Sequence, residues 1–225
     1  MAGDLDLGVT LNFLARLRKN NNKGWFDANK DEYLEAAAQF ESLVARLIEG
    51  LGRTEDLGDL TPKDCIMRIY RDVRFSKDKS PYKTGFGAGI APGGRKSGRV
   101  GYHLHLAPGE TMVATGLWDP TPEQLTRFRD SIVADASAFN RILGTAAFKK
   151  HFEGLWGEQL KTAPRGYPAD HPSIDLLRRK QVCVTERFAD GVVTSARFPA
   201  LALGSMEAMK PFAAYLDQVA MGRRR

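Results

Sequence analysis

Residues 84–117 decide the fold, and they read TGFGAGIAPGGRKSGRVGYHLHLAPGETMVATGL. Strand-forming residues gather in three short runs of this stretch, and we expect strands at 84–91, 100–107 and 111–117. The segments between these runs are brief and rich in glycine and proline. Because so short a connection joins antiparallel neighbours and leaves no room for a crossover helix, the stretch predicts an antiparallel sheet made of hairpins.

Helical patterns precede this sheet. Thr10 can cap a short helix, and Asp27 can cap a longer one whose apolar residues recur at three- and four-residue steps as far as Leu51. Between that helix and the sheet, residues 65–75 alternate in the manner of a further strand. The N-terminal part therefore predicts two helices followed by one more strand.

Helices return after the sheet. Thr121 can cap a helix with proline at its first position, Ser137 can cap another, and Ser205 can cap the last one. Two more strands are expected at 181–188 and 192–198. The predicted fold class is α+β, with an N-terminal helix pair, a central, mainly antiparallel sheet, and C-terminal helices packed on it.

The composition is that of a globular protein with one core. Hydrophobic residues make up 43% of the 225 residues and charged residues 27%, and no stretch resembles a linker. We expect a single domain over 1–221 and a basic disordered tail at 222–225. The N-terminus lacks a basic cluster followed by an apolar run, and no segment is apolar for long enough to span a bilayer. Two cysteines, Cys65 and Cys183, both in predicted strands, favour a reducing, cytoplasmic location without a membrane partner.

Basic residues are concentrated just before the predicted sheet. The chain carries a formal net charge of +6, and residues 68–84 read RIYRDVRFSKDKSPYKT. Strand alternation would put Arg68, Tyr70, Asp72 and Arg74 on one face and apolar residues on the other. An excess of guanidinium and ammonium groups over carboxylates favours an anion as the ligand of this segment.

The spacing Arg-x-x-Arg-Asp-x-Arg-Phe-x-x-x-Lys-x-x-Tyr closely resembles the signature of the bacterial domain of unknown function 2461 family. The matching positions are Arg68, Arg71, Asp72, Arg74, Phe75, Lys79 and Tyr82. Further matches stand at Phe13-Leu14, Asn21, Trp25-Phe26, and in residues 161–172 and 176–178. The resemblance covers about residues 11–178 and implies a protein of similar length with an α+β body and no known activity.

A site for a small phosphorylated or carboxylated anion is the leading hypothesis for this segment. Arginine forks grip phosphate or carboxylate oxygens with two hydrogen bonds, Asp72 would orient the arginines, and Tyr82 would donate its hydroxyl. The predicted ligand-binding residues are Arg68, Arg71, Asp72, Arg74, Lys79 and Tyr82. The alternative is that Arg–Asp pairs line a solvated sheet face and each contributes little. If the site catalyses a reaction, Asp72 or His105 is the nearest candidate for the general base.

Two other patterns in the sheet have structural explanations. His103 and His105 stand two residues apart on a predicted strand and share one face, but no third ligand accompanies them in a recognised spacing, so we predict no metal site. The glycine-dense run 84–89 lacks the lysine and hydroxyl end of a phosphate loop. Close backbone approach within the sheet explains that run better.

Two further functions stay open. In nucleic-acid binding, the same basic residues and the loop 95–99 would track a phosphate backbone, although the mild net charge counts against it. In an interaction or structural protein, the arginines would pair with carboxylates of another subunit. The sequence identifies neither a cofactor nor an oligomeric state, and it does not decide whether the protein is an enzyme.

Overall fold

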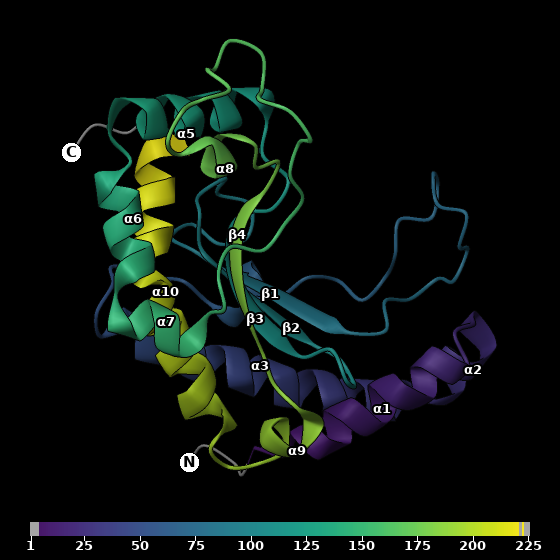
Figure 1. Cartoon of the computed structure of the whole chain (residues 1–225). Helices are drawn as coiled ribbons and strands as arrows, with labels where there is room; N and C mark the ends of the chain where they lie inside the picture. The colour runs from purple at the N-terminus through teal and green to yellow at the C-terminus, as the bar shows by residue number, and fades with distance from the viewer. Residues whose placement is uncertain (1–4, 221, 223–225) are drawn as a thin grey trace. The chain divides into compact units, whose positions relative to one another are not determined.

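The computed structural model describes residues 5–220 and 222 (Figure 1). The helices before the sheet are α1 (Leu7–Lys19), α2 (Lys23–Ala28), α3 (Lys30–Gly52) and α4 (Pro62–Cys65). The strands β1 (Phe86–Ile90), β2 (Tyr102–Leu106) and β3 (Met112–Leu117) come next. They are followed by α5 (Pro122–Asp135), α6 (Ser137–Gly144), α7 (Ala146–His151), α8 (Ile174–Leu177), β4 (Val182–Arg187), α9 (Asp190–Val193) and α10 (Phe198–Ala220).

The four strands form one antiparallel sheet in the order β1-β2-β3-β4. Each strand lies inside one of the predicted ranges, and the short connections between the first three strands are those expected of hairpins. With helices before and after this sheet, the predicted α+β fold class is confirmed.

Backbone contacts divide the chain into two compact units, each drawn from several stretches of sequence. The described residues of the first unit lie within Met1–Ser97, His103–Val113 and Arg187–Gly204. Those of the second lie within Gly98–Tyr102, Ala114–Glu186 and Ser205–Arg225. The single domain expected over 1–221 stays a prediction.

In the first unit, α1 packs along α3 and α3 contacts β1. Apolar residues at helical spacing bury one face of each helix, and Leu14, Leu17, Leu43 and Val44 are almost fully buried. An aromatic cluster extends this core, because Phe26 packs against other rings of the unit. These contacts anchor the chain that leads into β1.

The predicted starts of the first two helices are wrong. Asp6 caps α1 by accepting a hydrogen bond from the Gly8 amide at 2.8 Å, whereas Thr10 is buried inside the helix and donates to the Ala36 carbonyl. Asp27 lies within α2, whose cap is Asn22. The buried partner of Thr10 explains the error, since a hydroxyl residue can serve a tertiary contact instead of a cap.

The strand predicted at 65–75 is also wrong. Its first residue ends α4, and the rest is irregular chain with isolated bridges from Ile66 to Ala88 and from Tyr70 to Tyr82. Pro81 accepts a hydrogen bond from the Arg71 amide at 2.9 Å but has no N–H to return one. The pairing therefore stops there, and residues 72–80 form a loop that precedes β1 (Figure 1).

In the second unit, aromatic side chains of α6, α7 and α10 form the centre of the core. The Phe212 ring lies 5.6 Å from Phe139 and 6.1 Å from Phe148. Thr121 caps α5 as predicted, through a reciprocal pair of hydrogen bonds with Gln124. The helix expected at Ser137 is present as α6, but Ser137 is its first residue and not its cap, which is Ala136.

The C-terminal elements differ from two predictions. The strand expected at 192–198 is instead the short helix α9 and the start of α10, because backbone turns follow Ala189 and Ser195. The last helix begins at Phe198, so that Ser205 is a buried residue inside it rather than its cap. Apolar residues continue α10 towards its N-terminus, which explains the longer helix.

The cysteines are buried and free, but only Cys183 lies in a strand, since Cys65 ends α4. No helix within residues 5–220 and 222 has the length and apolar character needed to cross a bilayer. Of the basic tail predicted at 222–225, Arg223, Arg224 and Arg225 lie outside the described residues.

Candidate functional site

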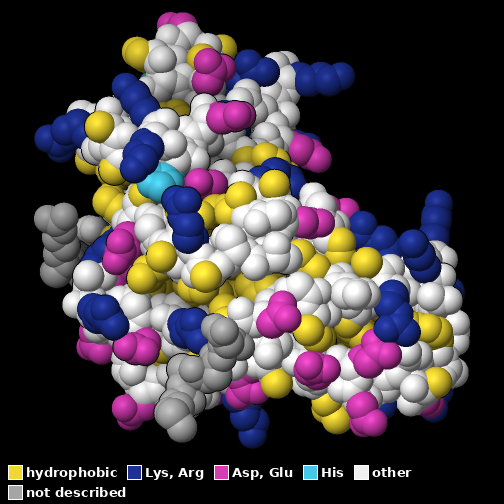
Figure 2. Space-filling view, turned by 90° about the horizontal axis from the view of Figure 1, so that it is seen from below, with side chains coloured by type: hydrophobic (Ala, Val, Ile, Leu, Met, Phe, Trp, Pro, Cys, Tyr) yellow, Lys and Arg dark blue, Asp and Glu magenta, His cyan; other side chains and the backbone are white. Residues whose placement is uncertain are grey.

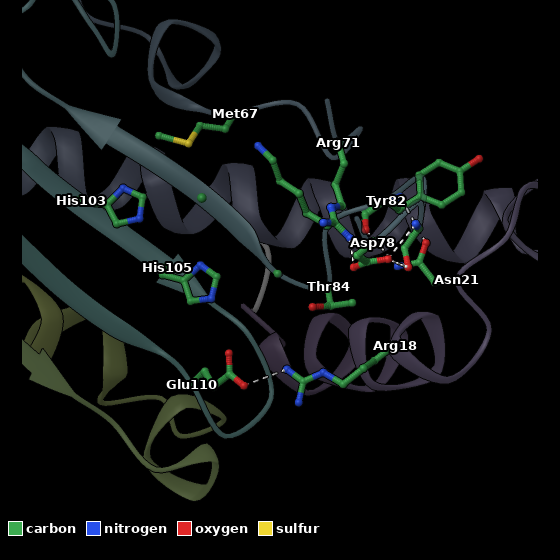
Figure 3. Close-up of a pocket in the computed structure, with 14 residues that line it drawn as sticks. Arg18, Asn21, Met67, Arg71, Asp78, Tyr82, Thr84, His103, His105 and Glu110 are labelled. Carbon is green, nitrogen blue, oxygen red and sulfur yellow. Dashed lines mark hydrogen bonds and ion pairs between the residues drawn. The ribbon is translucent and has the colours of Figure 1, made fainter. Parts of the chain in front are cut away.

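A pocket of about 580 Å³ opens in the first unit (Figure 3). Its walls come from α1, the segment before β1, β1, β2 and the turn between β2 and β3. The lining residues that carry charge or an imidazole are Arg18, Arg71, Asp78, Lys83, His103, His105 and Glu110. Three cations and two carboxylates leave one positive charge in excess.

Two histidines of β2 form one wall of the pocket. Strand alternation buries Tyr102, Leu104 and Leu106 on one side and turns His103 and His105 to the other. The imidazole rings are nearly parallel, with centroids 6.4 Å apart. Among the described residues, the histidine rings that form hydrogen bonds are those of His151 and His171. The ring nitrogen atoms of His103 and His105 are therefore available to a ligand.

Burial keeps these imidazoles neutral at neutral pH. It lowers the pKa of His103 to about 4, and the neighbouring His105 and Lys83 add to this effect. Burial also lowers the pKa of His105, where Glu110 acts in the opposite direction. A neutral imidazole can donate one hydrogen bond and accept another, or take up a proton.

Glycines opposite the histidines make room for the two rings. A Cβ atom at Gly85 would lie 2.7 Å from Cε1 of His105, and one at Gly87 would lie 3.6 Å from Cε1 of His103 and 3.3 Å from Sδ of Met67. The close approach expected for the glycine-dense run is therefore confirmed. A Gly-x-Gly run beside a His-x-His strand creates the hollow that becomes the pocket.

Lys83 supplies the pocket's uncommitted cation. Its backbone is held by a hydrogen bond from its amide to the Ile69 carbonyl at 2.8 Å, while no described residue accepts a hydrogen bond from its ammonium group. Burial, with a smaller contribution from Arg68, lowers the pKa of Lys83. Both effects disfavour the charged form, so an anion close to this ammonium would be stabilised.

The two arginines of the pocket already have carboxylate partners. Arg71 forms an ion pair with Asp78, and Asp78 also accepts hydrogen bonds from the amide and hydroxyl of Ser80 at 2.9 and 2.6 Å. These bonds from Ser80, followed by Arg71, hold the pKa of Asp78 far below its usual range. Arg18 lies 3.5 Å from Glu110, as the dashed line in Figure 3 shows.

Of the residues predicted to bind a ligand, Arg71 and Tyr82 line the pocket. Tyr82 is 4% exposed, stacks on Phe26 at 4.0 Å, and exchanges backbone hydrogen bonds with the Asn21 side chain. Its ring points away from the imidazoles of His103 and His105 (Figure 3). Tyr82 therefore supports the wall instead of offering its hydroxyl.

The other predicted ligand-binding residues lie outside the pocket lining, on the segment 68–79. Arg74 holds both carboxylate oxygens of Asp72, at 3.0 and 2.7 Å, and both side chains are exposed. Lys79 donates to the Val73 carbonyl at 2.9 Å, and Arg68 is exposed. Their role in binding stays a prediction.

Of the two candidates for a general base, His105 lines the pocket and Asp72 does not. The hydrogen bonds from Arg74 lower the pKa of Asp72, which makes its carboxylate a weaker base. His105 lies in the pocket beside His103. Within the described residues, no group of three or more His, Cys, Asp or Glu side chains is placed to hold a metal ion.

Sequence reasoning did not connect Lys83, Arg18 and Glu110 with the histidines. Lys83 stood at the edge of the signature, and Arg18 and Glu110 come from a helix and a turn that only the fold brings to the pocket. The available signal was the pair of patterns Gly-x-Gly and His-x-His on strands expected to be neighbours. Together these patterns indicate rings set over glycines, with space beside them.

A family model described as conserved hypothetical protein (DUF2461) matches residues 9–215. The chain belongs to the DUF2461 family. All pocket-lining residues of this DUF2461 protein, from Arg18 to Glu110, fall within the matched range. No curated protein and no solved structure matches the chain. The family description names no activity, so a function for this DUF2461 protein has to be argued from the pocket.

Proposed function

We propose that the pocket of the first unit binds a small phosphorylated or carboxylated anion. The observation that carries the proposal is that Lys83, His103 and His105 offer uncommitted donors in one hollow. Arg18 and Arg71 are held by carboxylates at its edges and add to the positive potential.

The size of the hollow supports a small ligand. A volume of about 580 Å³ lies within the range of about 300–1,000 Å³ that small-molecule sites occupy. The site is also partly buried, so a charge-assisted hydrogen bond from Lys83 is worth more there than on an open surface. A surface loop such as 72–80 provides less of this advantage.

A thermal-shift screen tests the proposal. The purified chain is heated with sulfate, phosphate, sugar phosphates, nucleotides, dicarboxylates and short oligonucleotides, because a ligand that binds the folded state raises the melting temperature. Hits are then measured by calorimetry with Lys83→Met, which keeps the length of the side chain and removes its charge. We expect Lys83→Met to weaken binding by about 10- to 100-fold, the loss of one charge-assisted hydrogen bond.

Lys96→Met is the matched control. Lys96 is exposed on the loop between β1 and β2 and does not line the pocket, so its replacement should leave affinity unchanged. Equal affinities of Lys83→Met and the unaltered chain would refute the pocket as the site. If Arg74→Ala alone abolished binding, the segment 68–79 would be the site.

Nucleic-acid binding and partner binding are outcomes that the same screen separates. Figure 2 shows Lys and Arg side chains dispersed among Asp and Glu over the face in view, and a phosphate backbone is better served by a continuous basic stripe. Retention of oligonucleotides with a steep dependence on salt would replace our proposal with nucleic-acid binding. A salt-sensitive change in sedimentation without any anion hit would indicate association between subunits.

A further inference from the structure

We propose that the pocket's ligand is a compact, doubly charged anion, such as the dianion of a phosphate monoester, and that it enters together with one proton, which the His103–His105 pair takes up. This inference rests on the proposed function, because it concerns the ligand of the same pocket. It adds the charge of that ligand and the means by which the protein balances it.

The charges already present in the pocket lead to this conclusion. Among the residues that line the pocket, Asp78 and Glu110 counter the positive charges of Arg71 and Arg18, so Lys83 is the remaining cation. A monoanion would be neutralised by Lys83 alone. A dianion would leave one negative charge in a partly buried site, and the imidazoles are the adjacent groups that can become cations near neutral pH.

The uncommitted donors lie close together, which favours two charges on one group over two separate carboxylates. Lys83 and His105 are both near enough to His103 to act on its titration. Phosphate and sulfate present several oxygens around one centre, so the ammonium and the imidazoles can share one anion. An extended dicarboxylate would need a second uncommitted cation among the lining residues, where Lys83 alone has this property.

Charged groups act on the imidazoles from each neighbouring element. Lys83 approaches from the segment before β1, Arg18 from α1, Arg187 from the end of β4, and Glu110 from the turn after β2. The uncharged neighbours are Met67, Gly85 and Gly87. Three cations and one carboxylate favour the neutral form of the pair, and an added dianion reverses that balance.

The direction and rough size of the effect follow from electrostatics. An opposite charge within about 4–6 Å raises the pKa of a cationic acid by about 1–3. His103, whose pKa is about 4 in the free protein, would then titrate between about pH 5 and 7 in the complex. Because the complex holds more protons than the free protein, affinity for a dianion rises as pH falls between those two pKa values.

Nuclear magnetic resonance of the histidine Cε1–H groups provides the test. Sulfate serves as a probe that stays doubly charged throughout, and methanesulfonate at equal ionic strength serves as a tetrahedral monoanion. The four histidines of the chain are titrated between about pH 3.5 and 8 in each salt, a window that spans the free and bound pKa values. His103→Asn and His105→Asn assign the pocket signals, while His151 and His171 lie outside the pocket lining and report general salt effects.

We expect sulfate to raise the apparent pKa of the pair by at least about 1, with little change in methanesulfonate. We expect the double variant His103→Asn/His105→Asn to bind sulfate with an affinity that no longer rises at low pH. If sulfate binds and neither pocket signal shifts, the proton uptake is refuted and anion binding stands. An equal shift with methanesulfonate refutes the preference for a dianion, and absence of any anion binding refutes both proposals.

Discussion

Gly85 lies directly beneath the imidazole of His105, so closely that a Cβ atom at position 85 would come within 2.7 Å of Cε1 and within 2.9 Å of Cβ of Ala107. So close a contact cannot persist without movement of one partner. The ring of His105 is the movable partner, since Ala107 follows β2 and is buried.

Gly85→Ala should therefore displace His105 and weaken anion binding. We expect a loss of about tenfold in sulfate affinity, together with about 1–3 kcal/mol of stability from overpacking. Calorimetry and urea unfolding measure the two quantities. Gly52→Ala is the control, because a Cβ atom at that position, the end of α3, would have nothing within 4 Å. Unchanged sulfate affinity in Gly85→Ala would show that the placement of His105 is irrelevant to binding.

Asn21 is expected to be a structural support of the pocket wall. Its amide accepts a hydrogen bond from the Tyr82 N–H at 3.1 Å and donates one to the Tyr82 carbonyl at 2.9 Å, as a neighbouring strand would. Asn21→Ala removes both bonds at a part-buried position and should cost about 1–3 kcal/mol. Urea unfolding beside Asn140→Ala, an exposed position in α6, tests this value. Equal stabilities of the two variants would contradict the support role.

The histidine pair should make the folded state sensitive to acid. His103 has a pKa of about 4 in the folded chain and about 6.5 when unfolded, so the unfolded state binds more protons between these values. Stability is fully present above about pH 6.5 and falls with pH down to about 4, by about 3 kcal/mol from this group. His103→Asn should show a shallower loss than the unaltered chain over this window. Parallel curves of stability against pH would argue against a neutral, buried His103.

Arg74→Ala should leave anion binding intact. Arg74 and Asp72 pair with each other on an exposed loop, such pairs contribute little to stability, and neither residue lines the pocket. We expect sulfate affinity to stay within about twofold of the unaltered chain, as surface ion pairs have small effects. A large loss of affinity would restore the sequence prediction that places the ligand at Arg74 and Lys79.

The sheet and the longer helices could be predicted because local patterns determine them. Short glycine- and proline-rich connections fixed hairpins between residues 84 and 117, and the Thr121 cap began α5 where expected. The prediction of a strand at 65–75 was wrong because residue alternation alone does not show whether a neighbouring segment can complete the hydrogen bonds. There Pro81 cannot return a hydrogen bond to Arg71, so the ladder is incomplete.

The candidate site could be predicted only in part. Conspicuous arginines directed attention to residues 68–79, but the charges of Arg71 and Arg74 are satisfied locally by Asp78 and Asp72, which the sequence shows only as neighbours. Lys83 is distinctive because its ammonium lacks such a partner among the described residues, and that property depends on the fold. The contact between Trp118 and Trp156 in the second unit also depends on the fold. The two rings stack with centroids 4.5 Å apart although the residues are far apart in the sequence.

The central claim, that Lys83 and the histidine pair hold an anion, is tested most directly by locating one. Crystals grown with selenate, a tetrahedral dianion whose selenium scatters anomalously, would show where the ion binds. We predict an anomalous peak within hydrogen-bond distance of the Lys83 ammonium and of one imidazole of the His103–His105 pair. A peak at Arg68, Arg74 or Lys79 with none in the pocket would contradict the claim.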